Sequence, residues 1–341
     1  MARIAVLTGG STPERTVALA GAAKVSAALR ARGHDVTVFD TIEPGPLDAE
    51  LERRRLGRSV GTRPPSLAEL RELEVREDLS SLVAGELGSH DAVFLVLHGR
   101  QGEGGEVQGL LEAAGIAYTG SDARSSRLAM DKDRSKRRFR DAGIPTPDWL
   151  TWPGRQSDIE ELGLPLIVKP SRVGSTVGLT LMADLFDLDS AVGKALTFDD
   201  QVILEQFLPG REYTVGVLDG QALGVGEIVA PGVIFDFHSK YTPGRAREIF
   251  PAEIDEALQS RFRDLARAAH EALALRDFSR VDFRLDAAGS PCCLEVNTLP
   301  GMTPTSLLPQ SAAVFGISFE DLCDRMIRLA LRRVVQFGRE D

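Results

Sequence analysis

The sequence predicts a multidomain α/β protein that begins with a doubly wound (Rossmann-like) parallel-sheet domain. Its 341 residues correspond to two or three domains at about 150 residues each. Short apolar runs alternate with longer helical patterns, and the chain starts with a strand, a helix and a strand within about forty residues. Such a unit is right-handed and its strands are parallel by default.

The first domain is expected to span residues 1–120. Apolar runs at residues 3–7, 36–40 and 92–97 are typical of buried parallel strands, and the expected helices lie at residues 14–30 and 106–114. Residues 98–105 are rich in glycine and predict a loop. Residues 43–88 are charged and rich in proline, which predicts a surface insertion.

The rest of the chain predicts two further domains, at residues 121–205 and 206–341. The middle one is expected to hold a basic helix at residues 131–141 and strands at 165–169, 179–182 and 202–205. The last is expected to hold strands at 213–218, 224–229, 280–285 and 292–296, and helices at 254–275 and 318–333.

Composition excludes several classes of protein. Fifty acidic against forty basic residues leave a formal charge of −10, which argues against a nucleic-acid partner, because such proteins neutralise phosphates with a basic face. The strongly apolar run at residues 92–97 is far shorter than the roughly 20 residues that span a bilayer. The N-terminus also lacks the apolar stretch of a signal peptide. We therefore expect a cytoplasmic protein with no membrane association.

A loop at residues 170–178 is the first candidate site. It contains Gly174, Ser175, Thr176 and Gly178 and follows Lys169, the end of an apolar strand. Glycines allow backbone N–H groups to approach an anion, and the lysine is well placed to meet a phosphate. The alternative is an ordinary β-hairpin with flexible turn residues.

The second candidate site lies on the strands at residues 280–285 and 292–296. Arg280 and Asp282 share one face of their strand, as do Glu295 and Asn297. If the strands pair as a hairpin, the oxygens of Asp282, Glu295 and Asn297 converge, and such hard ligands suit Mg²⁺. The alternative is a solvated sheet face with scattered charges.

Other candidates are weaker. His98 follows an apolar strand, where open α/β sheets bind ligands, although a lone histidine is more often structural. Lys132 and Lys136 fit a solvated helix face equally well. No Ser-His-Asp or Cys-His arrangement stands out. These residues alone predict an enzyme that binds a phosphorylated ligand with Mg²⁺.

An ordered series of motifs covers nearly the whole chain. They lie at residues 9–15, 97–103, 118–121, 130–132, 168–178, 205, 210–212, 240–241, 280–282 and 295–307. Together they resemble the D-alanine–D-alanine ligase family of ATP-grasp enzymes. The resemblance implies that the N-terminal domain is followed by a two-domain ATP-grasp fold that holds ATP between its sheets.

The resemblance also implies site residues. The nucleotide would be bound by Lys132, Lys169, Ser175, Glu205, Gln206, Leu208, Glu212 and Lys240. Two Mg²⁺ ions, with Mn²⁺ as an alternative, would be held by Asp282, Glu295 and Asn297. The substrates would be bound by Glu14, His98, Arg280, Ser306 and Leu307. The catalytic residues would be Glu14, Ser175, Tyr241, Arg280 and Gly301, with Arg280 and the N–H of Gly301 facing the developing oxyanion.

The implied activity is ATP-dependent joining of two D-alanine molecules through an acylphosphate, with release of ADP and phosphate, for peptidoglycan precursor synthesis. A homodimer is the expected assembly. The pair Lys240–Tyr241 favours an amine acceptor and therefore a dipeptide product. Two alternatives stay open here: a related carboxylate–amine ligase with a different D-amino-acid acceptor, and a nucleotide-binding regulatory protein without turnover.

Overall fold

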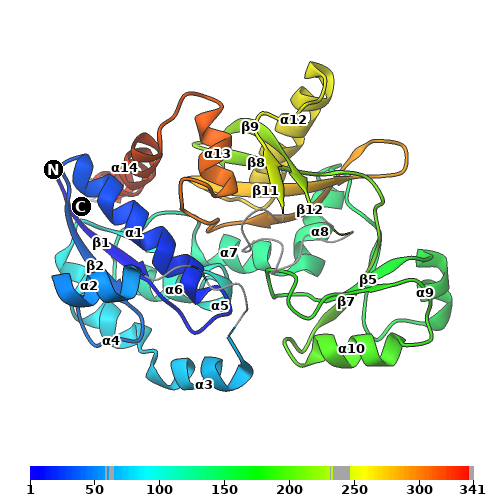
Figure 1. The fold of residues 1–341 in the computed structure, drawn as a ribbon, viewed down its shortest axis with the longest axis horizontal. Coiled ribbons are helices and arrows are strands. Elements are labelled where there is room, and N and C mark those ends of the chain that lie inside the picture. Colours follow the sequence, from blue (N-terminus) through cyan, green and yellow to red (C-terminus); the bar gives the residue numbers. More distant parts are fainter. Residues whose placement is uncertain (58–59, 61–64, 231, 233–245, 338–341) are drawn as a thin grey trace.

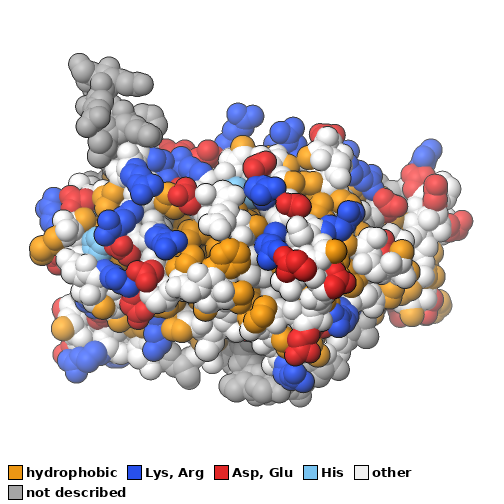
Figure 2. All heavy atoms as spheres, turned by 90° about the horizontal axis from the view of Figure 1, so that it is seen from above, with side chains coloured by type: hydrophobic (Ala, Val, Ile, Leu, Met, Phe, Trp, Pro, Cys, Tyr) orange, Lys and Arg blue, Asp and Glu red, His pale blue; other side chains and the backbone are white. Residues whose placement is uncertain are grey.

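Three sheets organise the chain in the computed structural model, which describes residues 1–57, 60, 65–230, 232 and 246–337 (Figure 1). They contain three, four and five strands. Among the described residues, no helix combines the length and apolar character needed to cross a membrane. On the face displayed in Figure 2, basic and acidic side chains are interspersed rather than gathered by sign.

The N-terminal sheet has the predicted parallel form. Strands β1 (Arg3–Thr8), β2 (Asp35–Asp40) and β3 (Ala92–Val96) lie in the order β2-β1-β3. Val6 pairs with Val38 on one side and with Phe94 on the other. Every residue of β3 is buried, which explains its continuous apolar sequence. Helices α1 (Arg15–Ala31) and α6 (Glu106–Ala113) match the predicted helices.

The glycine-rich stretch after β3 is not simply a loop, as predicted, because it contains the short helix α5 (Gly99–Gly102). A Cβ on Gly102 would lie 2.7 Å from Leu97, so glycine allows this helical turn to sit against the end of the strand. The sequence obscured α5 because glycine disfavours helices.

The described part of residues 43–88 also contains more regular structure than the predicted surface insertion. It forms α2 (Ala49–Leu56), α3 (Leu67–Arg76), α4 (Leu79–Ala84) and a 3₁₀ turn at Leu87–Ser89. Six of its apolar side chains join the N-terminal core: Leu47, Leu56, Leu79, Leu82, Val83 and Leu87. The prediction was wrong for these residues, because three short helices contribute only a few core contacts each and give weak periodicity.

The middle sheet consists of β4 (Trp149–Thr151), β5 (Leu166–Pro170), β6 (Thr180–Met182) and β7 (Val202–Gln206). Its order is β4-β7-β5-β6, and all neighbours are antiparallel. Helix α10 (Leu188–Leu196) packs against β5 and β7, and α9 (Gln156–Leu162) against β4 and β7. This region has a core of its own.

The third sheet has the order β10-β9-β8-β11-β12. Its strands are β8 (Glu212–Leu218), β9 (Gln221–Val229), β10 (Arg247–Ile249), β11 (Phe278–Leu285) and β12 (Pro291–Asn297). Helix α12 (Glu256–Ala272) buries Phe262 with Val215, whereas Leu308 of α13 (Leu307–Ala313) lies against Gly216. Since neighbouring residues of a strand face opposite ways, the two helices cover opposite faces.

Packing crosses the predicted domain boundaries at two places. Helices α7 (Ala123–Met130) and α8 (Lys132–Asp141) pack against β12 and join the core of the third sheet, although residues 121–205 were predicted as one unit. Helix α14 (Phe319–Phe337) returns to the N-terminal domain and lies beside α1 (Figure 1). Sequence order therefore does not give the domain membership of these helices.

Candidate active site

A cavity of about 700 Å³ lies where the three regions meet. Its lining includes the following predicted site residues: Glu14, His98, Lys132, Lys169, Ser175, Glu205, Gln206, Leu208, Glu212, Arg280, Asp282, Glu295, Asn297, Gly301, Ser306 and Leu307. Lys240 and Tyr241 lie outside the described residues. Residues from distant parts of the chain thus share one cavity of a size typical of ligand sites.

The predicted hairpin of β11 and β12 forms one polar wall of the cavity. Asp282 pairs with Glu295 and Arg280 pairs with Asn297. Arg280 donates to both oxygens of Asp282, at 2.9 and 2.7 Å, and Asn297 Nδ2 donates to Asp282 Oδ2 at 3.0 Å. Burial by itself would lower the pKa of Arg280, but Asp282, Glu295 and Glu103 raise it above its usual value. Arg280 therefore stays cationic.

Thr214 is a member of this wall that the sequence did not reveal. It lies on β8, paired with Asp282, and its Oγ1 donates to Asp282 Oδ1 at 2.7 Å. The signal would have been the pairing of β8 with β11, which the sequence does not specify. Three side chains donate four hydrogen bonds to the Asp282 carboxylate and hold it in one orientation, so its position is fixed before any ligand binds.

Asp282, Glu295 and Asn297 fit a divalent cation of the Mg²⁺ type. Carboxylate and amide oxygens are the hard ligands that Mg²⁺ prefers, and paired strands provide a rigid frame for them. The alternative of scattered charges on a solvated face is wrong for Asp282, which is 8% exposed.

Helix α8 directs two lysines inward. Lys132 is 6% exposed and Lys136 is fully buried, so the alternative of a solvated helix face is wrong. Lys132 Nζ donates to the carbonyl of Val173 at 3.0 Å and lies 3.2 Å from Glu295 Oε2. Lys132 thereby connects the glycine-rich loop with the polar wall. A phosphate bound beside Lys132 would lie between the loop and the wall.

Lys169 of β5 and Glu205 of the neighbouring strand β7 are diagonal neighbours in the sheet and form an ion pair. The distance from Lys169 Nζ to Glu205 Oε1 is 2.6 Å, and Lys136 Nζ lies 2.6 Å from the other carboxylate oxygen. Burial by itself would raise the pKa of Glu205, but the two ammonium groups hold it below its usual value. Glu205 is therefore ionised between two lysines.

The glycine-rich loop reaches across to the N-terminal domain. Ser175 Oγ donates to Glu14 Oε1, and Glu14 immediately precedes α1. Ser175 and Thr176 have φ values of 54° and 58°, a region that residues other than glycine seldom occupy. Such conformations persist where the surroundings enforce them, which is common at functional sites.

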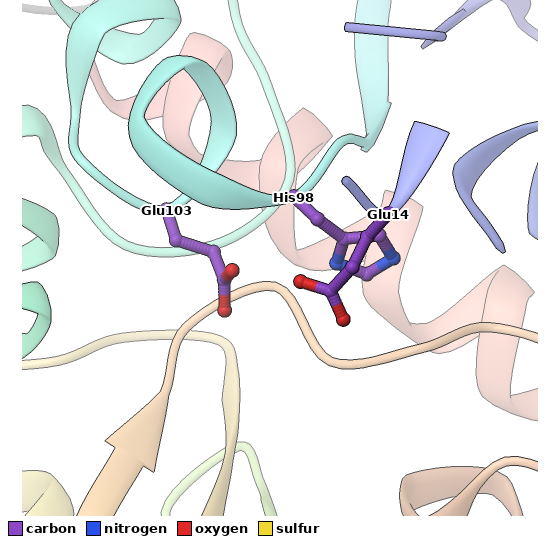
Figure 3. Close-up of side chains that lie close together, drawn as sticks. All are labelled: Glu14, His98 and Glu103. Atoms are coloured by element: carbon purple, nitrogen blue, oxygen red, sulfur yellow. The ribbon is translucent and has the colours of Figure 1, made fainter. Parts of the chain in front are cut away.

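Three acid–base side chains of the N-terminal domain converge beside this loop (Figure 3). His98 and Glu103 flank α5, and their polar atoms and those of Glu14 point toward one another. Burial, and then the charge of Glu14, raises the pKa of Glu103 to about 8, whereas burial lowers the pKa of His98. At neutral pH, Glu103 is therefore protonated and His98 is neutral. No role for Glu103 could be assigned from the sequence, although it lies in the motif at residues 97–103.

The far end of the cavity is formed by the turn before α13. Thr303 N donates to Ser306 Oγ at 3.1 Å, and Ser306 immediately precedes the helix. A Cβ on Gly301 would lie 3.0 Å from Ser306 Oγ, so glycine allows this close approach. The first N–H groups of a helix have no partner within it and favour anions. This end of the cavity is therefore suited to a carboxylate.

Comparisons with known proteins agree with this geometry. Residues 3–121 match the family model of the D-ala D-ala ligase N-terminus, and residues 139–328 that of the C-terminus. A D-alanine–D-alanine ligase of Anaeromyxobacter sp. (strain Fw109-5) is 41% identical, over 95% of this chain and 96% of its own.

Solved structures agree as well. The D-alanine–D-alanine ligase from Bacillus anthracis, complexed with ATP, has a TM-score of 0.77 at 30% identity and covers 99% of this chain and 100% of its own. The VanG D-Ala:D-Ser ligase from Enterococcus faecalis has a TM-score of 0.76 at 31% identity, with 96% and 99% covered. The structure and the sequence of this chain together show that it belongs to the D-alanine–D-alanine ligase family.

Proposed function

We infer that this chain is an ATP-dependent ligase that joins two D-alanine molecules into D-alanyl-D-alanine, a precursor of peptidoglycan. The observation that carries this conclusion is the cavity where Glu14, the loop of Ser175 and the Arg280–Asp282 wall meet. Intact charged residues on all sides favour catalysis over a regulatory protein without turnover.

ATP would lie between the middle and third sheets. Lys132 and Lys169 would bind its phosphates, Glu212 the ribose, and Glu205, Gln206 and Leu208 would lie near the adenine. Because Glu205 is engaged by two lysines, we expect its role toward the base to be shared with the neighbouring backbone. Ser175 would close the glycine-rich loop over the phosphates, and Lys240 is a further predicted contact.

A divalent cation would be held by Asp282, Glu295 and Asn297. Such a cation would neutralise the negative charge of the phosphates during transfer. The chain itself prepares this site, because Arg280, Thr214 and Asn297 fix the Asp282 carboxylate by hydrogen bonds. We propose two Mg²⁺ ions, or Mn²⁺ in their place: the chemistry of these ligands supports the type of ion, and the family resemblance implies the number.

The first D-alanine would bind with its ammonium group at Glu14, which Ser175 orients, and beside His98. Its carboxylate accepts the γ-phosphoryl group, which gives an acylphosphate and ADP. The second D-alanine, bound through its carboxylate at Ser306 and the N–H of Leu307, attacks the carbonyl with its amine. Phosphate leaves, a proton is lost from nitrogen, and an amide forms. Arg280 and the N–H of Gly301 would stabilise the oxyanion.

Water must be excluded while the acylphosphate exists, because it would otherwise be hydrolysed. We propose that Tyr241 helps to orient Ser175 and Glu14 and that the pair Lys240–Tyr241 favours an amine acceptor over D-lactate. A homodimer and a cytoplasmic location also stay proposals.

The test is a product analysis. Purified protein is incubated with ATP, Mg²⁺ and D-alanine, alone or in competition with D-serine or D-lactate, and products are identified by mass. We expect mainly D-alanyl-D-alanine and one phosphate per dipeptide. An Asp282→Asn variant serves as the inactive control. A mixed dipeptide with D-serine as the main product would support the alternative acceptor, and a predominantly ester product would refute the assignment.

A further inference from the structure

The buried cluster of Lys136, Glu205 and Lys169 contains a residue whose contribution the proposed function does not explain. Lys136 lies on α8, and its side chain is 0% exposed. Burying an ammonium group is costly unless it is paired and hydrogen-bonded. The presence of a charged side chain at this buried position therefore needs an explanation.

Several groups hold the Lys136 ammonium in place. It lies 2.6 Å from Glu205 Oε2, donates to Thr146 Oγ1 at 2.7 Å and contacts the carbonyl of Pro147 at 3.4 Å. The Thr146 hydroxyl donates to the carbonyl of Cys293 at 2.8 Å, so its oxygen is turned to accept from Lys136. The ammonium is therefore fixed rather than mobile.

The charges in this cluster do not cancel. Burial lowers the pKa of Lys136 below its usual value, and the charge of Glu205 opposes this shift. With both ion pairs formed, Lys136 and Lys169 contribute two positive charges, and Glu205, whose side chain is 4% exposed, contributes one negative charge. Each lysine binds a different oxygen of the same carboxylate. The Lys169 side chain is 12% exposed and Lys169 lines the cavity, whereas Lys136 does not contribute to the lining. The cluster thus presents one net positive charge toward the cavity, through Lys169.

We propose that Lys136 is a positioning residue that neutralises Glu205, so that the charge of Lys169 remains available to the polyphosphate of the nucleotide. Without Lys136, the carboxylate of Glu205 would be balanced by Lys169 alone. Charge interactions are strong in such a buried setting because solvent screens them weakly. Lys136 acts through Glu205 and does not touch the ligand. The inference rests on the ATP-binding role proposed above.

The experiment is a double-variant cycle read by calorimetric binding. ATP and adenosine are titrated separately into wild type, Lys136→Met, Glu205→Gln and the double variant. In the presence of Glu205, Lys136→Met should reduce the affinity for ATP by about tenfold or more. In the Glu205→Gln background the same substitution should reduce the affinity for ATP by less than about threefold, because the acid that Lys136 neutralises is gone.

Adenosine distinguishes a charge effect from a change in pocket shape. It carries no phosphate, so Lys136→Met should reduce the affinity for adenosine at least about threefold less than the affinity for ATP, even though Glu205 also lies near the proposed position of the adenine. Arg140→Met is the matched control, because Arg140 lies one turn further along α8 and pairs with the exposed Asp148. It should leave the affinities for ATP and adenosine at wild-type values.

Three results would overturn the inference: an unchanged ATP affinity in Lys136→Met, an equal loss in both backgrounds, or an equal loss for adenosine. Lys136→Gln, which keeps a donor for Thr146 but no charge, should repeat the pattern if Lys136→Met does not fold. Wild-type protein that fails to bind ATP would refute the proposed function instead, so the two failures are distinguishable.

Discussion

Glu103 should make the stability of this protein depend on pH in a direction unusual for a carboxyl group. Its side chain is buried beside Glu14, and its pKa lies at about 8 instead of the ordinary 4.5. Between these values, the folded protein holds a proton at Glu103 that the unfolded chain has released. The free energy of unfolding must therefore fall as pH rises through this interval.

The size of the effect follows from the two pKa values. Each pH unit between them removes about 1.4 kcal/mol from the free energy of unfolding. From pH 6 to pH 7.5 the loss attributable to Glu103 is about 2 kcal/mol, and it levels off above about pH 8, where both states are ionised. Burial is the main cause, and the charge of Glu14 adds to it.

The assay compares unfolding of wild type and Glu103→Gln across this pH range, without substrates. Glutamine resembles the neutral acid but cannot ionise, so the variant should gain about 2 kcal/mol relative to wild type between pH 6 and pH 7.5. The unfolding midpoints should then diverge by several degrees. The Glu106→Gln variant changes an exposed acid on the neighbouring helix α6. Its unfolding stability should vary with pH in parallel with that of wild type. Parallel curves for Glu103→Gln would refute the reasoning.

Four further predictions concern the site and its frame. Glu295→Gln should reduce dipeptide formation by about 100-fold or more without unfolding the protein, since it removes a metal-binding charge; near-normal turnover would exclude Glu295 from the metal site. Tyr241→Phe should weaken binding of the first D-alanine, as measured by steady-state kinetics, and a matching loss of ATP affinity would contradict the role assigned to Tyr241. Gly226→Ala should cost about 1–3 kcal/mol in thermal unfolding, because the new Cβ would lie 2.1 Å from the Phe250 ring; unchanged stability would contradict this. In hydrogen exchange, amides of α3 should exchange before those of α4, which buries Leu79, Leu82 and Val83, and the opposite order would show that α3 packs more firmly.

The sequence predicted most elements because their signals are local. The strand at β3 is a continuous apolar run, and alternation along β11 and β12 predicted that Arg280 and Asp282 share one face of their strand and Glu295 and Asn297 one face of theirs. The pairing of Asp282 with Glu295 depends in addition on a register shift between Asp282 and Phe283, which alternation does not predict. The same locality explains the errors. The helices within residues 43–88 are short and share their core contacts, and α5 contains glycine, which disfavours helices.

The motifs identified the wall of the cavity, but they did not reveal the environment of each side chain. Glu103 and Lys136 are an acid and a base in a charged sequence, and nothing in their neighbours along the chain shows that both are buried. Thr214 became part of the site only because β8 lies beside β11.

By itself, therefore, the sequence determined which faces of the helices and strands are apolar and which residues could carry the chemistry. The tertiary structure decided which partner buries each face: α14 packs on α1, and α8 packs on β12 rather than within the middle domain. The physical reason is that periodicity defines an apolar face without naming its partner. Burial and the distances between charges depend on that choice, and they set the protonation of Glu103 and the charge balance around Glu205.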